Sequence, residues 1–446
     1  MSKHSKSKHS TLPHTRAIQR DRTKRPNTAA PDQQIEARLT EIVHPATLNQ
    51  VAHFHDLGLR QRTLNLPVMM AFVLSLIWRQ FGSVAEAVRS LNREGLLWVN
   101  ECKVSQQALE QRLSSLPAIL FERVLHDLLP SMAARWQARS RPLPPALRWA
   151  HEHFSAVLAL DGSTLDVLLR KTGLLREQDR PVLAGRMAAL LDVISRLPRQ
   201  IWYEEDPLAH DQRFWERILA GLQREMLLIF DVGFLNFARF DALTEAEVWF
   251  VTRQDARVTF RTQTVLRRTD TLQEQLVHLG SRSNRKCKHV LRQIEWLHQG
   301  KWYRYLTNVL EVQRLPAEYV VALYWQRWRI EDSFNVVKRV LGLAYFWSGS
   351  INGVQLQLWA TWIVYAVLVD LTDAVAQALN KPFQALSLEM VYRGLYHYTV
   401  AYHRGKATDP IAYLAADAKG LGILKREQKD RTAITDLLYL TIPVPP

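Results

Sequence analysis

Hydrophobic positions recur with helical spacing in the first and last parts of the chain and form short continuous runs in between. From residue 35 to about 148 the pattern is helical throughout, with few strand signals. Ser83 and Ser105 each stand directly before a helical segment, where a serine side chain caps free backbone amides. Pro67 suits the first turn of the apolar helix that follows it. These short helices with nearby arginines fit a helix-turn-helix module, although any small helical bundle has the same pattern.

Two apolar runs after residue 155 predict strands that are buried on both faces of a sheet. Residues 156–160 and 226–230 are continuously apolar, whereas strands exposed on one face alternate. Each run ends in an aspartate, Asp161 or Asp231, directly before a turn that contains glycine. Further strands are predicted at 185–198, 199–206 and 247–254, and a helix at 206–224.

Residues 256–315 interrupt this pattern with more strand-like sequence. Segments 257–265 and 301–309 are strand-like, and the basic segment 281–289 between them is predicted to be a loop. Helical spacing then returns at 316–342, 353–380 and 385–398. The chain is therefore predicted to have an α/β fold, with a strand-rich insertion inside the α/β region.

Charge and length narrow the class of protein. The 446 residues, 47% of them hydrophobic, carry a formal net charge of +15. Two or three globular domains and a polyanionic partner are expected, and both nucleic acid and an anionic membrane surface fit that charge. The most apolar stretch, 356–376, is interrupted by Gln357, Asp370 and Asp373. We therefore expect a buried helix there and no association with a membrane.

The two cysteines and the N-terminal sequence point to a cytoplasmic protein. Cys102 and Cys287 are each isolated, which excludes a zinc finger and fits a reducing compartment. The N-terminus has no apolar segment of the kind that signal peptides carry. Residues 1–34 are polar and basic without periodicity, so we predict a disordered arm that either contacts DNA or only aids solubility.

One face of the helix predicted at 316–342 carries polar and charged side chains. Tyr324, Arg327, Glu331 and Lys338 fall within an arc of roughly 60° when each residue turns the helix by about 100°. An apolar stripe beside this face predicts packing against a core. Taken alone, Arg327 and Glu331 form an ordinary ion pair at i,i+4 spacing on a solvated helix.

The three acids Asp161, Asp231 and Glu331 give that face a second interpretation. An aspartate after a strand is commonly a turn former, but groups at the ends of neighbouring strands converge on one crevice. Three converging carboxylates repel one another unless cations bind between them, and oxygen ligands alone favour Mg²⁺ or Mn²⁺. Two such ions promote in-line displacement at a phosphodiester. Arg327 and Lys338 would then hold phosphate oxygens.

These motifs resemble the DDE transposases of bacterial insertion sequences, in the subgroup with a Tyr-(2)-Arg-(3)-Glu-(6)-Lys signature. The signature matches Tyr324, Arg327, Glu331 and Lys338. The two aspartate blocks of the family are similar to LALDGSTLDV around Asp161 and LLIFDVGF around Asp231, and the family's helix is similar to LYWQRWRIEDSFNVVK. The resemblance covers about 155–370.

The resemblance implies a function and a site. The expected activity is cleavage of double-stranded DNA at insertion-sequence ends and strand transfer to target DNA, in the cytoplasm and as a homodimer on DNA. Asp161, Asp231 and Glu331 are implied as catalytic ligands of two Mg²⁺ ions, which Mn²⁺ can replace. Tyr324, Arg327 and Lys338 are implied as contacts to DNA.

The resemblance also implies an organisation into domains. It predicts an RNase H-like catalytic core, a mixed sheet flanked by helices. The predicted parts are a disordered basic arm at 1–34, a helical DNA-binding domain at 35–150, the core at 151–255 and 316–380, a β-rich insertion at 256–315, and a C-terminal helical region at 381–446 that is a candidate for dimerisation.

Three rival functions remain open from the sequence. An RNase H-like nuclease or resolvase would cut DNA without joining it. A catalytically silent transposase relic would only bind DNA. A carboxylate-pair hydrolase that acts on sugars is the third, but such a function gives no role to Arg327 and Lys338 beside Glu331.

Overall fold

The computed structural model describes residues 33–165, 185–206, 209, 211–234, 236–280, 286–343, 346–348, 350–425 and 436–442. All but the last two residues of the predicted basic arm at 1–34, and most of the predicted basic loop at 281–289, lie outside these ranges. The domain boundaries given above stay predictions.

Nine strands form one mixed sheet in the order β3-β2-β1-β4-β5-β9-β8-β7-β6. The neighbours β1, β4 and β5 are parallel, and every other neighbouring pair is antiparallel. All five predicted strands before residue 255 are present. The strands are β1 Ala156–Thr164, β2 Arg186–Asp192, β3 Pro198–Glu204, β4 Met226–Phe230, β5 Trp249–Arg253, β6 Phe260–Arg268, β7 Leu272–Leu279, β8 Leu291–His298 and β9 Lys301–Thr307.

The strand-rich segment 256–315 extends this sheet. Strand β9 pairs antiparallel with β5, for example Val251 with Thr307, and β8, β7 and β6 follow outward. The sequence pattern predicted the first and last of these four strands in the chain, β6 and β9, but missed β7 and β8. Both missed strands mix polar and apolar residues without clean alternation, because each buries polar side chains of its own, Glu274 in β7 and Arg292 and Gln293 in β8.

The regular structure of the described chain outside the sheet is helical. Helical structure at 35–148 is confirmed, including the caps, since the hydroxyls of Ser83 and Ser105 accept from the amides of Glu86 and Ala108 at 3.2 Å. The helix predicted at 206–224 is shorter, because a 3₁₀ turn at Asp211–Phe214 precedes it. The helices are α2 Gln33–Asn49, α3 Val51–Asp56, α4 Leu66–Trp78, α5 Val84–Arg93, α6 Gln106–Ser115, α7 Ile119–Gln137, α8 Pro145–His153, α10 Trp215–Ala220, α11 Phe237–Glu245, α12 Ala317–Gln326, α13 Trp328–Asn335, α14 Ile351–Ala378, α15 Leu388–His403 and α16 Pro410–Ala416.

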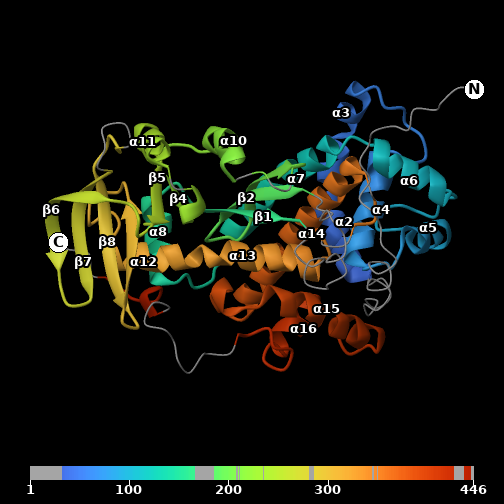
Figure 1. Ribbon diagram of the computed structural model, residues 1–446. Coiled ribbons are helices and arrows are strands. Elements are labelled where there is room, and N and C mark those ends of the chain that lie inside the picture. The colour runs from blue at the N-terminus through green and yellow to red at the C-terminus, as the bar shows by residue number, and fades with distance from the viewer. Residues whose placement is uncertain are drawn as a thin grey trace, which may run out of the picture.

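Alternate residues of the central strands face two different hydrophobic cores. Leu158 and Leu160 of β1 join the core that α10 and α11 cover. Val157 and Ala159 join the larger core on the other face, which includes side chains of α12, α13 and α14. In Figure 1, β6–β8 lie at one end of the molecule, α2–α6 lie at the other, and α12 and α13 run between them. Odd-numbered positions of β1 therefore face α12 and α13.

Helix α14 is the centre of the helical part. It packs against α4, α6, α7 and α16, and its apolar side chains are buried all round. By length and composition it would be able to cross a membrane, but its most apolar stretch is wholly buried by protein. The buried helix expected from the sequence is thus confirmed.

Arginines from α2, α7 and the segment directly after α7 neutralise two aspartates buried in α14. Asp370, whose side chain is 1% exposed, accepts ion pairs from Arg139 at 2.6 Å, Arg135 at 3.2 Å and Arg38 at 3.5 Å. Asp373 pairs with Arg139 at 3.1 Å and also with Arg141. Burial raises the pKa of Asp373, although the two arginines oppose that change. These pairs fix the N-terminal helices on α14.

Two local predictions about the site elements are wrong. Strand β1 does not end at Asp161, because residues Asp161–Thr164 continue to pair with Ala189–Arg186 of β2. The helix predicted from Pro316 to Gly342 is not continuous either. It breaks at Arg327 between α12 and α13, and Val336–Val340 form a π-helical turn.

Replacing Asp370 by Ala is expected to lower the free energy of unfolding by about 3 kcal/mol, since it leaves partly buried guanidinium groups without their counter-ion. Urea denaturation of the full chain measures this change. Glu245→Ala is the control, because Glu245 and its partner Lys288 are both more than half exposed and such a pair is worth less than about 1 kcal/mol. Equal losses for the two variants would contradict this account of the α14 contacts.

Candidate active site

Asp161 and Asp231 lie side by side on neighbouring parallel strands. The last residues paired between β1 and β4 are Leu160 and Phe230, and each aspartate follows directly. Both aspartates share the face of Val157, Ala159, Leu227 and Ile229, which is the face that α12 and α13 cover. The backbone amide of Gly162 donates to Oδ1 of Asp161 at 2.8 Å. The convergence predicted from the strand ends is therefore what the structure has, although β1 continues past its aspartate.

Tyr324 connects α12 to the second aspartate. Its hydroxyl donates to Oδ1 of Asp231 at 3.0 Å. Burial raises the pKa of Tyr324, and the nearby charge of Asp231 raises it further, so the phenol stays protonated as a donor. The ring of Tyr324 packs against the ring of Tyr305 on β9, and the two ring centroids are 5.1 Å apart. The extended part of the sheet thus supports this side of the site.

Arg327 joins the other two acids. Its Nη1 donates to Oδ2 of Asp161 at 3.1 Å, and its Nη2 donates to Oε1 of Glu331 at 3.3 Å. The Arg327 residue is only 4% exposed, whereas the side chain of Glu331 is 42% exposed. Burial lowers the pKa of Arg327, but the attraction of Asp161 and the other nearby acidic groups outweighs burial and raises it overall. One buried guanidinium therefore pairs with two of the three acids, Asp161 and Glu331.

The backbone at Arg327 is tightened, which separates α12 from α13. The amide of Arg327 donates to the carbonyl of Tyr324 at 3.0 Å, and the amide of Ile330 donates to that of Arg327 at 2.9 Å. Both bonds span three residues, as in a 3₁₀ turn. Ile330 and Phe334 still pack into the core below, so the break leaves α13 seated on the sheet.

Lys338 reaches the same strand from the π-helical turn. Its amine donates to the hydroxyl of Ser163, two residues beyond Asp161 and on the same face of β1. The amide of Leu341 donates to the carbonyl of Val336, five residues back, at 2.9 Å. Single π-turns of this kind occur often at functional sites. All six predicted site residues are thus gathered around β1, β4 and α13, and their roles stay predictions.

The carboxylate oxygens at this site are of the ligand type that a hard divalent cation prefers. Within the described ranges, no three His, Cys, Asp or Glu side chains are close enough together to hold a metal ion as they stand. The guanidinium of Arg327 pairs with Asp161 and Glu331 instead. Carboxylate oxygens are nevertheless the ligands that Mg²⁺ and Mn²⁺ prefer, and Asp161, Asp231 and Glu331 supply them.

Three neighbours of the site were not identified from the sequence. Ser163 stands two positions after Asp161, and strand periodicity would have found it had β1 been extended. Trp328 is 50% exposed, and its ring lies 5.0 Å from the guanidinium carbon of Arg327. Tyr305 lies on β9, which only the tertiary fold brings beside α12.

Comparison with known sequences identifies a family for this part of the chain. Residues 153–367 match the family described as Transposase DDE domain. This segment contains β1, β4, α12, α13 and the three acids. It excludes the helices α2–α7.

Curated relatives carry transposase names. One, named as the transposase y4zB of Sinorhizobium fredii, is 31% identical over 164 residues, which are 34% of this chain and 43% of that protein. Another, named as a transposase for insertion sequence element IS5377 of Geobacillus stearothermophilus, is 25% identical over 189 residues, or 41% of this chain and 48% of that protein. The chain therefore matches less than half the length of each of these relatives.

A solved structure with a distant likeness is a piggyBac transposase synaptic complex with hairpin DNA. It is 12% identical, covers 96% of this chain and 90% of its own, and has a TM-score of 0.34, too low to establish a shared fold. The family match and the curated relatives carry the likeness. Residues 153–367 match a transposase DDE domain, and this part of the chain is similar to the DDE transposases of insertion sequences.

Proposed function

We propose that this chain is an insertion-sequence transposase that cuts DNA at the ends of its element and joins those ends to target DNA. The observation that carries this proposal is the gathering of Asp161, Asp231 and Glu331 around the buried Arg327, inside a transposase DDE domain. The match of Tyr324, Arg327, Glu331 and Lys338 to the signature supports membership of the corresponding subgroup. The mixed sheet with helices on both faces supports an RNase H-like core.

The three carboxylates are the proposed holders of two Mg²⁺ ions, with Mn²⁺ as a substitute. When bound, such ions stabilise the attacking and leaving oxygens of a phosphodiester. Tyr324 keeps the carboxylate of Asp231 oriented through its hydroxyl. In the hydrolytic step water attacks phosphorus and a 3′-hydroxyl leaves. In the joining step that 3′-hydroxyl attacks a phosphodiester of the target DNA, whose own bond to the 3′-oxygen breaks and releases a new 3′-hydroxyl.

Arg327 and Lys338 are proposed to change partners when DNA binds. In the DNA-free chain Arg327 neutralises Asp161 and Glu331, and Lys338 donates to Ser163. Both cations lie beside the acids, where a phosphate of DNA must enter for cleavage. A guanidinium binds two phosphate oxygens as readily as two carboxylate oxygens, so Arg327 is suited to both states.

The rest of the chain is proposed to serve binding and assembly. The helical region 35–150 is the proposed DNA-binding domain, and 381–446 the proposed region of dimerisation on two DNA ends. We infer action in the bacterial cytoplasm, at the nucleoid when DNA is bound. The net charge of +15 supports double-stranded DNA as the partner.

Replacing Asp161 or Asp231 by Asn, or Glu331 by Gln, is expected to lower DNA cleavage by on the order of 10³-fold while leaving DNA binding largely unchanged. The substrate is the DNA that flanks the chain's own gene, incubated with Mg²⁺. Glu245→Gln, an exposed acid on α11, is the matched control and should cleave normally. Cleavage retained in any of the three acid variants would overturn the proposed site.

The same reactions separate the rival functions. Cut DNA without joined products would indicate a nuclease or resolvase. DNA binding without any cleavage by the unaltered chain would indicate a silent relic. Joined products that depend on the three acids are the result expected for a transposase.

Mg²⁺ or Mn²⁺ is expected to raise the thermal unfolding midpoint of the unaltered chain, because an ion that binds only the folded state stabilises it. The rise should be absent from Asp161→Asn and Asp231→Asn, and kept in Glu245→Gln. This readout does not depend on activity. An equal rise in all four proteins would count against metal ligation by these aspartates.

Replacing Lys338 by Gln should weaken binding to DNA of every sequence and reduce the slope of log affinity against log salt by about 1, as loss of one phosphate contact does. Arg327→Gln should do the same if the guanidinium transfers to DNA. Fluorescence anisotropy with labelled duplex DNA measures both slopes, with Lys301→Gln on the surface of β9 as the control. Unchanged slopes would show that neither cation contacts phosphate.

A further inference from the structure

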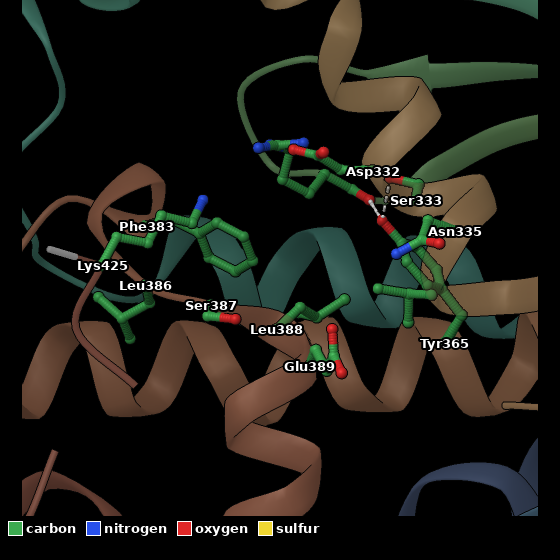
Figure 2. A pocket seen from close by; sticks show the side chains of 12 residues that line it. Asp332, Ser333, Asn335, Tyr365, Phe383, Leu386, Ser387, Leu388, Glu389 and Lys425 are labelled. Atoms are coloured by element: carbon green, nitrogen blue, oxygen red, sulfur yellow. Dashed lines mark hydrogen bonds between the residues drawn. The ribbon is translucent and has the colours of Figure 1, made fainter. Parts of the chain in front are cut away.

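A cavity of about 150 Å³ lies on the side of α13 that faces α14 and α15. Its lining comes from five separate parts of the chain: the loop after β2, α13 with the turn after it, the middle of α14, residues 383–389, and Lys425. Figure 2 shows Asp332, Ser333 and Asn335 on one side of this space and Phe383, Leu386 and Lys425 on the other. None of the six site residues discussed above lines it.

A buried arginine, Arg196, lines this cavity and forms no ion pair with a carboxylate within the described ranges. Arg196 is 5% exposed, and its Nη1 donates to the backbone carbonyl of Arg329 at 3.3 Å. Its Nε is buried and has no hydrogen-bond partner within the described part of the chain. Its guanidinium carbon lies 5.9 Å from the ring centroid of Phe383. Burial lowers the pKa of Arg196, and the charge of Arg329 lowers it further. A buried guanidinium in this situation attracts an anion.

Lys425 adds a second positive charge to the lining. Its amine donates to the carbonyl of Gln384 at 3.2 Å, and no ion pair joins it to a carboxylate among the described residues. Much of the Lys425 residue is open to solvent, yet protein atoms crowd around the amine. This burial lowers the pKa of Lys425, with Arg329 and Arg196 adding to the effect. An anion entering the cavity would relieve the repulsion among these cations.

The N-terminus of α15 opens into the same space. Ser387, Leu388 and Glu389 all line the cavity, and the hydroxyl of Ser387 accepts from the amide of Met390 at 3.3 Å. The first amides of a helix have no partner within the helix, and they carry partial positive charge. This 16-residue helix therefore presents backbone donors to the site of Arg196 and Lys425.

The two acids in the lining are already neutralised by other arginines. Asp332 pairs with Arg329 at 3.1 Å, and Glu389 pairs with Arg393 at 2.8 Å. Neither acid forms an ion pair with Arg196 or Lys425 among the described residues, although the charge of Asp332 attracts both cations. The hydroxyl of Ser333 and the amide of Asn335 add polar groups on the opposite side.

We propose that this cavity binds a phosphate group at a site separate from the three carboxylates. A volume of about 150 Å³ holds several water molecules, each of which takes about 30 Å³ in the liquid, and so has room for one tetrahedral anion. The phosphate comes either from the DNA backbone or from a free phosphate compound. The DNA source rests on the proposed function, whereas the phosphate site itself does not.

Thermal unfolding of the full chain in inorganic phosphate tests the site. Phosphate should raise the unfolding midpoint above that in sodium chloride of equal ionic strength, and Lys425→Gln should remove most of the rise. Lys419→Gln, which removes the same charge from an exposed position outside the cavity, should keep it. Arg196→Gln should also lose the rise. Because Arg196 is buried, its replacement can disturb folding, so Lys425→Gln is the decisive variant. No rise in the unaltered chain, or an equal rise in both lysine variants, would overturn the proposal.

Binding of labelled duplex DNA across a range of salt concentrations then identifies the source. For a backbone phosphate, Lys425→Gln should reduce the salt slope by about 1 relative to Lys419→Gln. For a free phosphate compound, the two slopes should be equal while the thermal difference remains. Cleavage by the unaltered chain and its loss in Glu331→Gln are scored separately, so failure at this cavity is distinct from failure of the proposed transposase activity.

Discussion

The site depends on one buried guanidinium that holds carboxylates from different elements together. Asp161 comes from the sheet and Glu331 from α13, and Arg327 donates to both while being almost inaccessible to solvent. Without a cation, these acids and Asp231 would repel one another. Arg327 therefore allows the acidic cluster to exist before DNA or metal is present. It also gives α12 and α13 a fixed position against the sheet.

The surrounding fold supplies the geometry for this interaction. Parallel pairing of β1 with β4 sets the two aspartates side by side on the face toward α13. The break at Arg327 and the π-turn at Val336–Val340 direct Arg327 and Lys338 toward β1, and the buried ion pairs of Asp370 hold α2 and α7 on α14. On the far side of α13, Arg196 and Lys425 gather positive charge around a second space.

Much of the candidate site follows from local sequence, and its finer geometry does not. Continuous apolar runs locate β1 and β4 and the aspartates after them, and helical spacing places Arg327, Glu331 and Lys338 on one side of a helix. The extension of β1 past Asp161 depends on pairing with β2, which no local pattern records. The helix breaks at Arg327, the residue that forms an ion pair with Asp161 on a distant strand, and local spacing does not predict that contact. Arg196 and Lys425 are far apart in sequence and meet only through the tertiary fold.

The most direct test of the central claim is to locate Mn²⁺ in crystals of the protein by its anomalous scattering. The account predicts a peak within coordination distance of the carboxylates of Asp161 and Asp231, with the guanidinium of Arg327 displaced from Asp161. A crystal soaked in Mn²⁺ that shows no peak at these carboxylates, with Arg327 still joining Asp161 to Glu331, would contradict it.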